Sequence, residues 1–367
     1  MKERILTKDN SKILQGIAIL MMVYHHIFID GNLWCINEGT SLINIFNFIN
    51  IGKAATAQMN FAWFCKICVA IFAFASGYGI FIQLENKTKE KIDLKEMYKY
   101  CFKRFLSFFK SFIICFLFFN ICIILTTPKG EGSFDYSFPN FLINALGLRT
   151  DYNGTFWYIP VYYCMIFISP LVYILLKKVD YKKIFIFIVA VLVIGSLIAL
   201  ATGSIVDYLK GVSTFIQQYQ TIFLIIFMEG MFCGRYQLIE TIYNKLNLFT
   251  GILLLAITYV GRTLLIRAPS DSLFDLVFTL PFVISVIKIL SYTKGLRKFF
   301  GFIGKYSAYI WYSHAYFYSY LFFGLVFKSD MSLIVYLQVV IYSLACGIVF
   351  DNIIKLIESC IKKIGTN

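Results

Sequence analysis

Two neighbouring histidines, His25 and His26, lie near the end of the first long apolar run, although the whole chain contains only three histidines. Imidazole exchanges a proton near neutral pH, so a histidine in an apolar run is a candidate general base. Adjacent residues of a helix point about 100° apart, so the two rings are expected to face different surroundings. Asp30 follows His26 by four residues and shares its helix face. The spacing therefore favours His26, oriented by Asp30, as the base.

A third histidine and a lone glutamate are the other ionisable residues of interest inside apolar runs. His314 lies among tyrosines and a tryptophan, so it is expected either to line a polar cavity or to be a structural residue bonded to a tyrosine. Glu229 is expected either to cap a cavity or to pair with a lysine of another helix. A plainer alternative is open for the first pair as well: His25 and His26 would mark the polar end of a helix at the lipid head groups, with Asp30 beginning a loop.

The composition indicates which solvent surrounds these residues. Of the 367 residues, 59% are hydrophobic and 15% are charged, whereas soluble globular proteins have about 25% charged residues. The chain is therefore expected to be an all-α polytopic membrane protein. Its net charge of +14 does not indicate nucleic-acid binding, because the basic residues lie in short clusters between apolar runs. Cys65 and Cys68 form a C-x-x-C pair with no second pair or histidine nearby, so no metal site is expected.

Apolar runs of about 20 residues, the length that a helix needs to cross a bilayer, recur about ten times. Lysine and arginine gather in alternate connections, which indicates that the N-terminus and the C-terminus are both cytoplasmic. The longest segments expected outside, 30–60 and 127–154, are too short for a separate soluble domain, so 1–367 is interpreted as one transmembrane domain. The predicted spans are 13–29, 61–83, 105–126, 155–176, 184–203, 215–234, 247–266, 272–292, 301–326 and 332–357.

Five stretches, taken in order on this topology, resemble the acyltransferase 3 family of integral membrane acyltransferases. The resemblance covers nearly the whole chain, and it implies an all-helical bundle that O-acylates cell-surface polysaccharides in bacteria. The stretches are LQGIAILMMVYHHIF in the first helix, CVAIFAFASGYGIFI in the second, YKYCFKRFLSFFKSF entering the third, GTFWYIPVYYCMIFISPLVY in the fourth and FIGKYSAYIWYSHAYFYSY in the ninth.

The family's motifs imply roles in the first two helices. In the first helix the family has an essential histidine eleven positions after an arginine, which matches His26 and puts Gln15 at the arginine position. On a helix that starts in the cytoplasm at Lys12, His26 lies about 20 Å along the axis, in the outer half of the membrane. The family's F-x-x-x-S-G motif matches residues 72–77, so Ser76 is expected to line the cavity.

The resemblance also implies the reaction and its donor. An acyl group, most often acetyl, would pass from cytoplasmic acetyl-CoA or another acyl-CoA, with no tightly bound cofactor, to a hydroxyl of an extracytoplasmic or lipid-linked polysaccharide. The family's R-x-x-R at the entrance to the third helix matches Arg104, while Ser107 stands at the second arginine position. Because phosphates bind cations, Arg104, Lys103 and Gln15 are expected to meet the donor. The expected location is the bacterial cytoplasmic membrane.

Three further residues are expected to meet the acceptor sugar, and two other functions are compatible with the sequence. Trp157 is expected to offer a sugar an aromatic platform, unless it belongs to the ordinary interfacial aromatic belt, and Glu229 and His314 are expected to line the same cavity. The first rival is a transporter or flippase for polysaccharide or lipid-linked sugar, with His26, Glu229 and His314 as a proton relay. The second is a non-catalytic membrane subunit on the same scaffold, which the two missing arginines favour.

Overall fold

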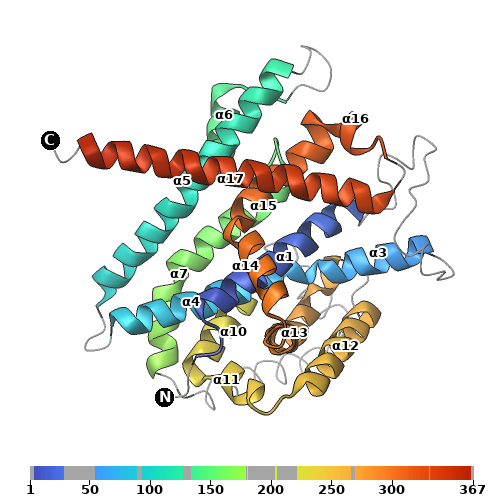
Figure 1. Cartoon of the computed structure of the whole chain (residues 1–367). Helices are drawn as coiled ribbons and strands as arrows, with labels where there is room; N and C mark the ends of the chain where they lie inside the picture. Colours follow the sequence, from blue (N-terminus) through green and yellow to red (C-terminus); the bar gives the residue numbers. More distant parts are fainter. Residues whose placement is uncertain are drawn as a thin grey trace. The chain divides into compact units, whose positions relative to one another are not determined.

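Every regular element that the structure describes is a helix (Figure 1), so the predicted all-α fold class is confirmed. The computed structural model describes residues 4–28, 54–88, 93–126, 134–178, 180, 203–204, 221–265, 269–329 and 331–364. The elements in chain order are α1 (Lys8–Phe28), α3 (Ala54–Cys65), α4 (Ile67–Lys87), α5 (Leu94–Thr126), α6 (Phe138–Ala145), η2 (Gly154–Trp157), α7 (Tyr158–Lys178), α10 (Thr221–Tyr236), α11 (Leu238–Tyr243), α12 (Leu248–Leu265), η3 (Pro269–Phe274), α13 (Asp275–Leu290), α14 (Lys294–Lys305), α15 (Ser307–Tyr316), η4 (Phe317–Leu321), α16 (Phe323–Val326) and α17 (Ser332–Ile364).

Seven helices of the described chain are long and apolar enough to cross a membrane, and each matches a span predicted from the sequence. The predicted span 184–203 lies almost wholly outside the described residues, and α10 covers most of 215–234. The count of ten and the cytoplasmic location of both termini stay predictions. The seven spans are Lys8–Phe28, Ala57–Lys87, Leu94–Thr126, Gly154–Lys178, Leu248–Leu265, Ser272–Leu290 and Ser332–Cys360.

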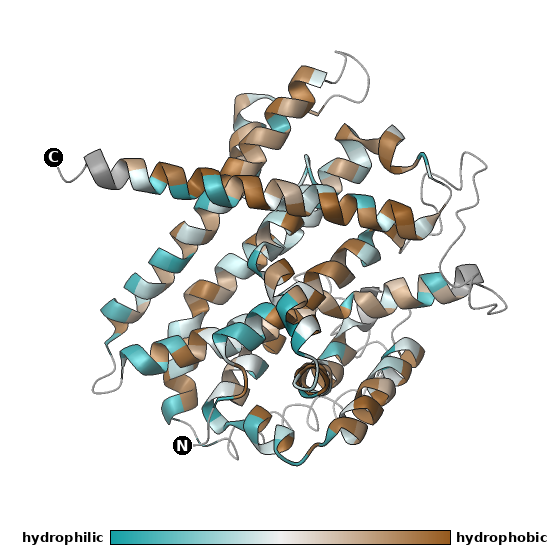
Figure 2. Ribbon diagram, in the orientation of Figure 1, coloured by the Kyte–Doolittle hydropathy of each residue, from teal (hydrophilic) through white to brown (hydrophobic). Residues whose placement is uncertain are grey.

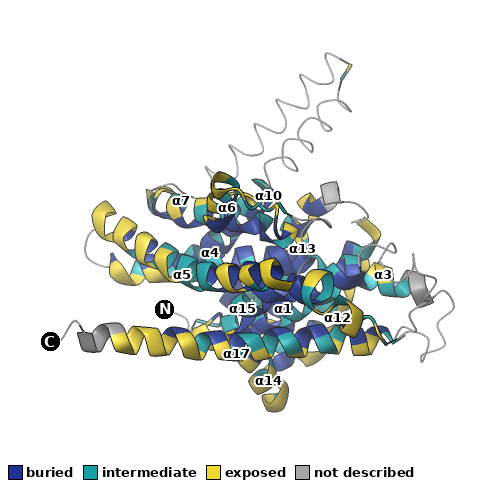
Figure 3. Ribbon diagram, turned by 90° about the horizontal axis from the view of Figure 1, so that it is seen from above, coloured by how far each residue is buried: buried dark blue, intermediate teal, exposed yellow. Residues whose placement is uncertain are grey.

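Large apolar side chains on the outside of these helices fit a lipid surrounding. Only 33% of the apolar stretch of α5 is buried in the protein, and the same share of α17, where Figure 3 shows many exposed residues in yellow. On α12, which Figure 2 colours brown, Leu253, Ile257 and Leu264 are about half exposed and recur at helical spacing. A stripe of this kind is unfavourable in water but matches hydrocarbon tails. The described helices are therefore those of a membrane bundle.

The predicted span 301–326 is wrong as a single helix. The structure divides it into the end of α14, then α15, the π-helical turn η4 and the short α16, with breaks at Tyr306 and Phe322. The physical reason lies in α14, which carries four basic residues among its twelve positions, in the sequence KGLRKFFGFIGK. A segment with that charge is costly to place in hydrocarbon, so α14 forms a helix separate from the apolar α15 that follows it.

The described parts form two compact units. Unit 1 comprises Met1–Ser11, Ala70–Phe102 and Val161–Tyr292, and unit 2 comprises Lys12–Val69, Lys103–Pro160 and Thr293–Asn367. Both units contain residues of membrane-spanning helices. The single transmembrane domain expected from the sequence stays a prediction.

Helices cross at paired glycines in both units. In unit 2 a Cβ on Gly16 of α1 would lie 2.0 Å from the carbonyl oxygen of Phe300, and one on Gly304 of α14 would lie 1.8 Å from that of Lys12. Glycine at both positions lets the two backbones touch, as small residues do at close helix crossings in membranes. In unit 1 Gly77 of α4 and Gly230 of α10 pack against each other's helices in the same way.

Aromatic side chains fill the interior of unit 2. The rings of Phe119 on α5 and Tyr316 on α15 are stacked with centroids 4.7 Å apart, and Phe112 meets Phe156 of η2 edge to face at 5.2 Å. Asn120, which is fully buried, donates a hydrogen bond to the Tyr316 hydroxyl at 3.1 Å. These contacts fix α15 against α5 and η2, and α15 carries His314.

Candidate functional site

A pair of histidines from opposite ends of the sequence meets inside unit 2. Nδ1 of His26 on α1 lies 2.7 Å from Nε2 of His314 on α15, and the two rings are close to parallel, with 10° between their planes. His314 is fully buried, and His26 is half-buried. The pair joins residues that are 288 positions apart, which no local sequence spacing predicts.

His25 has different surroundings, as the helix geometry predicts. Its Nδ1 lies 2.8 Å from the carbonyl oxygen of Ala62 on α3, and its ring meets that of Trp63 at a centroid distance of 6.3 Å. The side chain is 6% exposed. The two imidazoles therefore serve two different contacts: His25 joins α1 to α3, and His26 joins α1 to α15.

His314 is held by the backbone of its own helix. Its Nδ1 lies 2.8 Å from the carbonyl oxygen of Trp311 and 3.1 Å from that of Ile310. The Trp311 indole in turn donates to the carbonyl oxygen of Thr155 at 3.0 Å, which fastens α15 to η2. The hydrogen bonds of the His314 ring thus go to carbonyl oxygens and to His26, and not to a tyrosine hydroxyl of the described residues.

Asp30 lies outside the described residues, so its predicted role in orienting His26 stays a prediction. Among the described residues, the group that hydrogen-bonds to Nδ1 of His26 is the ring of His314. The direct contact between His314 and His26 is not predicted from the sequence, which suggests a polar cavity or a tyrosine as the surroundings of His314 and joins it to His26 only in the proton relay of the rival transporter. The available signal was weak: His25, His26 and His314 are the only histidines of the chain.

The residues expected to bind the donor lie on α1 and α5. Gln15 is half-buried on α1, directly before the crossing at Gly16. Lys103 is exposed on α5 and Arg104 is half-buried beside it. Gln15 and His26 are eleven residues apart on one helix, which corresponds to about 16 Å along the axis. The grouping of these three residues into a donor site stays a prediction.

Ser76 and Glu229 belong to unit 1 and are described there. Ser76 is half-buried on α4, next to the glycine of the crossing with α10. Glu229 is half-buried on α10; its Oε2 atom is buried, and this atom has no hydrogen-bond partner among the described residues. Glu229 also forms no ion pair with any described lysine, so the pairing considered in the sequence is not found in the described chain. The roles expected for both residues in the cavity stay predictions.

Trp157 ends η2, in a folded segment of unit 2 that runs from residue 134 to 157. Its half-buried ring meets that of Tyr158 edge to face at 5.7 Å. The 134–157 segment packs onto α5 and η4 through aromatic rings, since Phe116 stacks with Tyr152 and Phe134 meets Tyr320. Trp157 thus stands at the end of a segment that is tied to α15 through the neighbouring Thr155.

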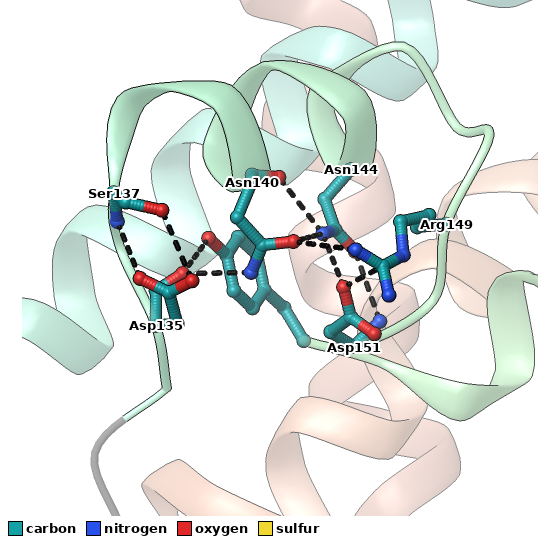
Figure 4. Close-up of polar contacts among 7 residues, drawn as sticks. Asp135, Ser137, Asn140, Asn144, Arg149 and Asp151 are labelled. Atoms are coloured by element: carbon teal, nitrogen blue, oxygen red, sulfur yellow. Dashed lines mark hydrogen bonds and ion pairs between the residues drawn. The ribbon is translucent and has the colours of Figure 1, made fainter.

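A network of polar side chains holds this segment in shape (Figure 4). Asn144 and Asp151 exchange two hydrogen bonds of 2.9 Å, and Arg149 lies 3.5 Å from the Asp151 carboxylate. Asp135 accepts hydrogen bonds from the backbone N–H and the hydroxyl of Ser137 at 2.9 and 3.0 Å. These two bonds lower the pKa of Asp135 below its usual value.

The chain was compared with known proteins in three ways. Neither the search of curated proteins nor the search of solved structures gave a match. A family model described as an acyltransferase domain matches residues 9–351, nearly the whole chain. The match spans both histidines of the pair as well as both units. The chain therefore belongs to the acyltransferase 3 family and is a multi-pass membrane acyltransferase.

Proposed function

We propose that the protein is an O-acyltransferase of the bacterial cytoplasmic membrane. It moves an acyl group, acetyl first among the candidates, from cytoplasmic acyl-CoA to a hydroxyl of an extracytoplasmic or lipid-linked polysaccharide. The observation that carries the proposal is the His26–His314 pair within an acyltransferase domain. A hydroxyl is a poor nucleophile until a base takes its proton, and the pair offers an imidazole for that task.

In the proposed reaction His26 is the general base. It takes the proton of the acceptor hydroxyl while the hydroxyl oxygen bonds to the carbonyl carbon of the thioester. The carbon–sulfur bond then breaks, and its electron pair leaves with the thiolate. His26 returns the proton to that sulfur, so the products are an ester on the glycan and free coenzyme A. The protonation state of His26 is the same before and after each turnover.

Donor and acceptor are expected at different heights of the bundle. Arg104 and Lys103 bind the donor phosphates, because a guanidinium can form two parallel hydrogen bonds with a phosphate and an ammonium adds charge. Gln15 contributes hydrogen bonds only. The phosphates are separated from the thioester by the long arm of coenzyme A, which suits the distance of about 16 Å between Gln15 and His26 along α1. Trp157 offers the acceptor sugar an aromatic face.

The test is an acyl-transfer assay in membranes that contain the protein, a radiolabelled acyl-CoA and the host's own surface glycan. His26→Ala is expected to lower ester formation by at least about 100-fold, the usual contribution of a general base. The matched control is His25→Asn, since the amide can still donate to the Ala62 carbonyl; it should keep most of the activity.

The rates of ester formation can be compared only if both variants are present in the membrane at wild-type level and have unchanged thermal stability. Ester formation that survives in His26→Ala contradicts the assignment of the base. An unchanged ester content together with a block in glycan export favours the transporter instead. Its candidate proton carrier would be Oε2 of Glu229, which has no hydrogen-bond partner in the described part of the chain. A wild-type protein with neither activity favours the non-catalytic subunit.

A further inference from the structure

We propose that His314 is a positioning residue that fixes the tautomer of His26, so that Nε2 of His26 is the atom that takes the proton. This inference rests on the proposed function, because it assigns the role of each ring nitrogen in that reaction. It follows from the hydrogen-bond partners of the two rings, taken in order from the backbone outward.

One ring nitrogen of His314, Nδ1, faces the backbone of its own helix. Nδ1 lies 2.8 Å from the Trp311 carbonyl oxygen and 3.1 Å from the Ile310 carbonyl oxygen. A carbonyl oxygen can only accept a hydrogen bond, so Nδ1 of His314 must carry the hydrogen. A neutral imidazole has one N–H, and Nε2 of His314 is therefore left with a lone pair.

The tautomer of His314 determines which nitrogen of His26 carries the hydrogen. Nε2 of His314 accepts, so the nitrogen 2.7 Å away, Nδ1 of His26, must donate. The hydrogen of a neutral His26 is thereby assigned to Nδ1, and its Nε2 carries the lone pair of a base. None of the described residues forms a hydrogen bond with this Nε2. In many catalytic sites a further group orients the general base by a hydrogen bond, and here His314 orients His26 in this way.

The same contact stabilises the ring after it has taken the proton. His26 then has two N–H groups, and the one on Nδ1 makes a charge-assisted hydrogen bond to the lone pair of His314. The buried position of His314 matters here, because a hydrogen bond to a charged group is stronger where water is excluded. Within the described chain, two further titratable rings lie near the pair. The ring centroid of His25 on α1 is 5.4 Å from that of His26, and the ring centroid of Tyr318 on η4 is 6.0 Å from that of His314.

The surroundings of α15 keep the ring of His314 in place. His314 lies in the last turn of α15, where all residues from Ile310 to Phe317 are buried, and the π-helical turn η4 follows at once. Turns of this kind occur often at functional sites. The indole of Trp311 is fixed to Thr155, so the residue that accepts from His314 is itself held. His314 therefore orients the ring of His26 through Nδ1, while Asp30, the orienting residue expected from the sequence, lies outside the described residues.

The first experiment measures the tautomers directly and needs no activity. The chain has only three histidines, so ¹⁵N-histidine labelling of the full protein in lipid bilayers gives six ring nitrogens to assign by solid-state NMR. At neutral pH Nδ1 of His26 and of His314 should be protonated and both Nε2 atoms unprotonated. In His314→Leu the preference of His26 for Nδ1–H should be lost. A wild-type His26 protonated at Nε2 overturns the proposal.

The second experiment uses two amides that differ by one methylene group. In His314→Gln the side-chain oxygen reaches about as far as Nε2 and can accept from His26, whereas the shorter side chain of His314→Asn cannot. We expect kcat to fall about 100-fold in His314→Asn and in His314→Leu but to stay within about tenfold of wild type in His314→Gln, with KM for acyl-CoA little changed in all three. Equal activity of the Gln and Asn variants, at equal thermal stability, contradicts the positioning role.

The two experiments separate this inference from the proposed function. If the NMR gives the expected tautomers and the wild type transfers no acyl group to any glycan, the hydrogen-bond assignment stands and the proposed function fails. If the wild type transfers acyl groups, His26→Ala is inactive and the His314 variants keep full activity, the proposed function stands and the role of His314 is wrong.

Discussion

The crossing of α1 and α14 gives the sharpest test of the packing in unit 2. Gly304→Ala adds one methyl group at the point where the backbones touch. That carbon would lie 1.8 Å from the Lys12 carbonyl oxygen and 2.9 Å from the backbone nitrogen of Gly16. Ordinary contact begins at 3.4 Å, so the helices must move apart by 3.4 − 1.8, or about 1.6 Å, to admit it. The obstacle is backbone, which cannot turn away as a side chain does.

The energetic outcome is the difference of two effects. Alanine is a better helix residue than glycine by about 1 kcal/mol. Overpacking of a close contact costs about 1–3 kcal/mol, and a backbone obstacle puts this site at the upper end. We therefore expect Gly304→Ala to lower the free energy of unfolding by about 2 kcal/mol. Acyl-transfer activity should fall too. α15 begins three residues after Gly304, so a shift of α14 away from α1 would lengthen the 2.7 Å hydrogen bond between His314 on α15 and His26 on α1.

Gly301→Ala on the same helix is the matched control. Of the residues that the structure describes, its new methyl group would meet only Ile13, whose side chain is 3.8 Å away, so the gain in helix propensity remains and no helix has to move. The measurement is thermal unfolding of both variants in lipid nanodiscs, together with their acyl-transfer rates. Gly301→Ala should match or exceed the wild type, while Gly304→Ala should unfold at a clearly lower temperature. Equal midpoints for the two variants would refute the close crossing.

Two further predictions concern an ion pair and a titration. In unit 1 Arg262 binds Asp275 through two hydrogen bonds of 2.7 and 3.2 Å, and both residues are fully buried. Arg262→Met should lower the free energy of unfolding by about 3–5 kcal/mol, because it leaves the Asp275 carboxylate buried without its partner. The double variant with Asp275→Leu should recover most of this loss, as measured by chemical denaturation. In unit 2 the bonds from Ser137 lower the pKa of Asp135, so the stability they add is complete above the ordinary pKa of aspartate and is lost as the pH falls through the lowered value. The difference in unfolding temperature between wild type and Asp135→Asn should accordingly shrink on acidification below about pH 4, and a constant difference would contradict the assignment.

The helices and the different surroundings of His25 and His26 could be predicted from the sequence because local rules determine them. The length of an apolar run predicts a span, as for α12, and a turn of about 100° per residue separates His25 from His26. The break at Tyr306 was missed because the apolar residues of α14 extend the run that α15 continues. The partner of His26 was missed for a different reason: the contact with His314 depends on how α1 and α15 pack, and nothing near either residue records it.

The sequence was also a poor guide to the 134–157 segment of unit 2. Asn144 and Asp151 are ordinary loop residues by type, yet they exchange two hydrogen bonds and shape the segment that ends at Trp157. Side chains that bond within a loop compete with water, and which pairs form depends on the backbone conformation. Polar residues between two spans therefore indicate a loop, whereas its folded form appears only in the structure.

The glycine crossing has a consequence for how α1 can change during evolution. Gly16 fixes the height and rotation of the helix against α14, and His26 stands ten residues beyond it, about 15 Å along the axis. One inserted residue between them would rotate the imidazole by about 100°, away from His314, whereas an exchange among apolar side chains would leave its direction intact. The residues from Ile17 to Tyr24 can therefore be exchanged for other apolar residues, but their number must stay the same for His26 to face His314.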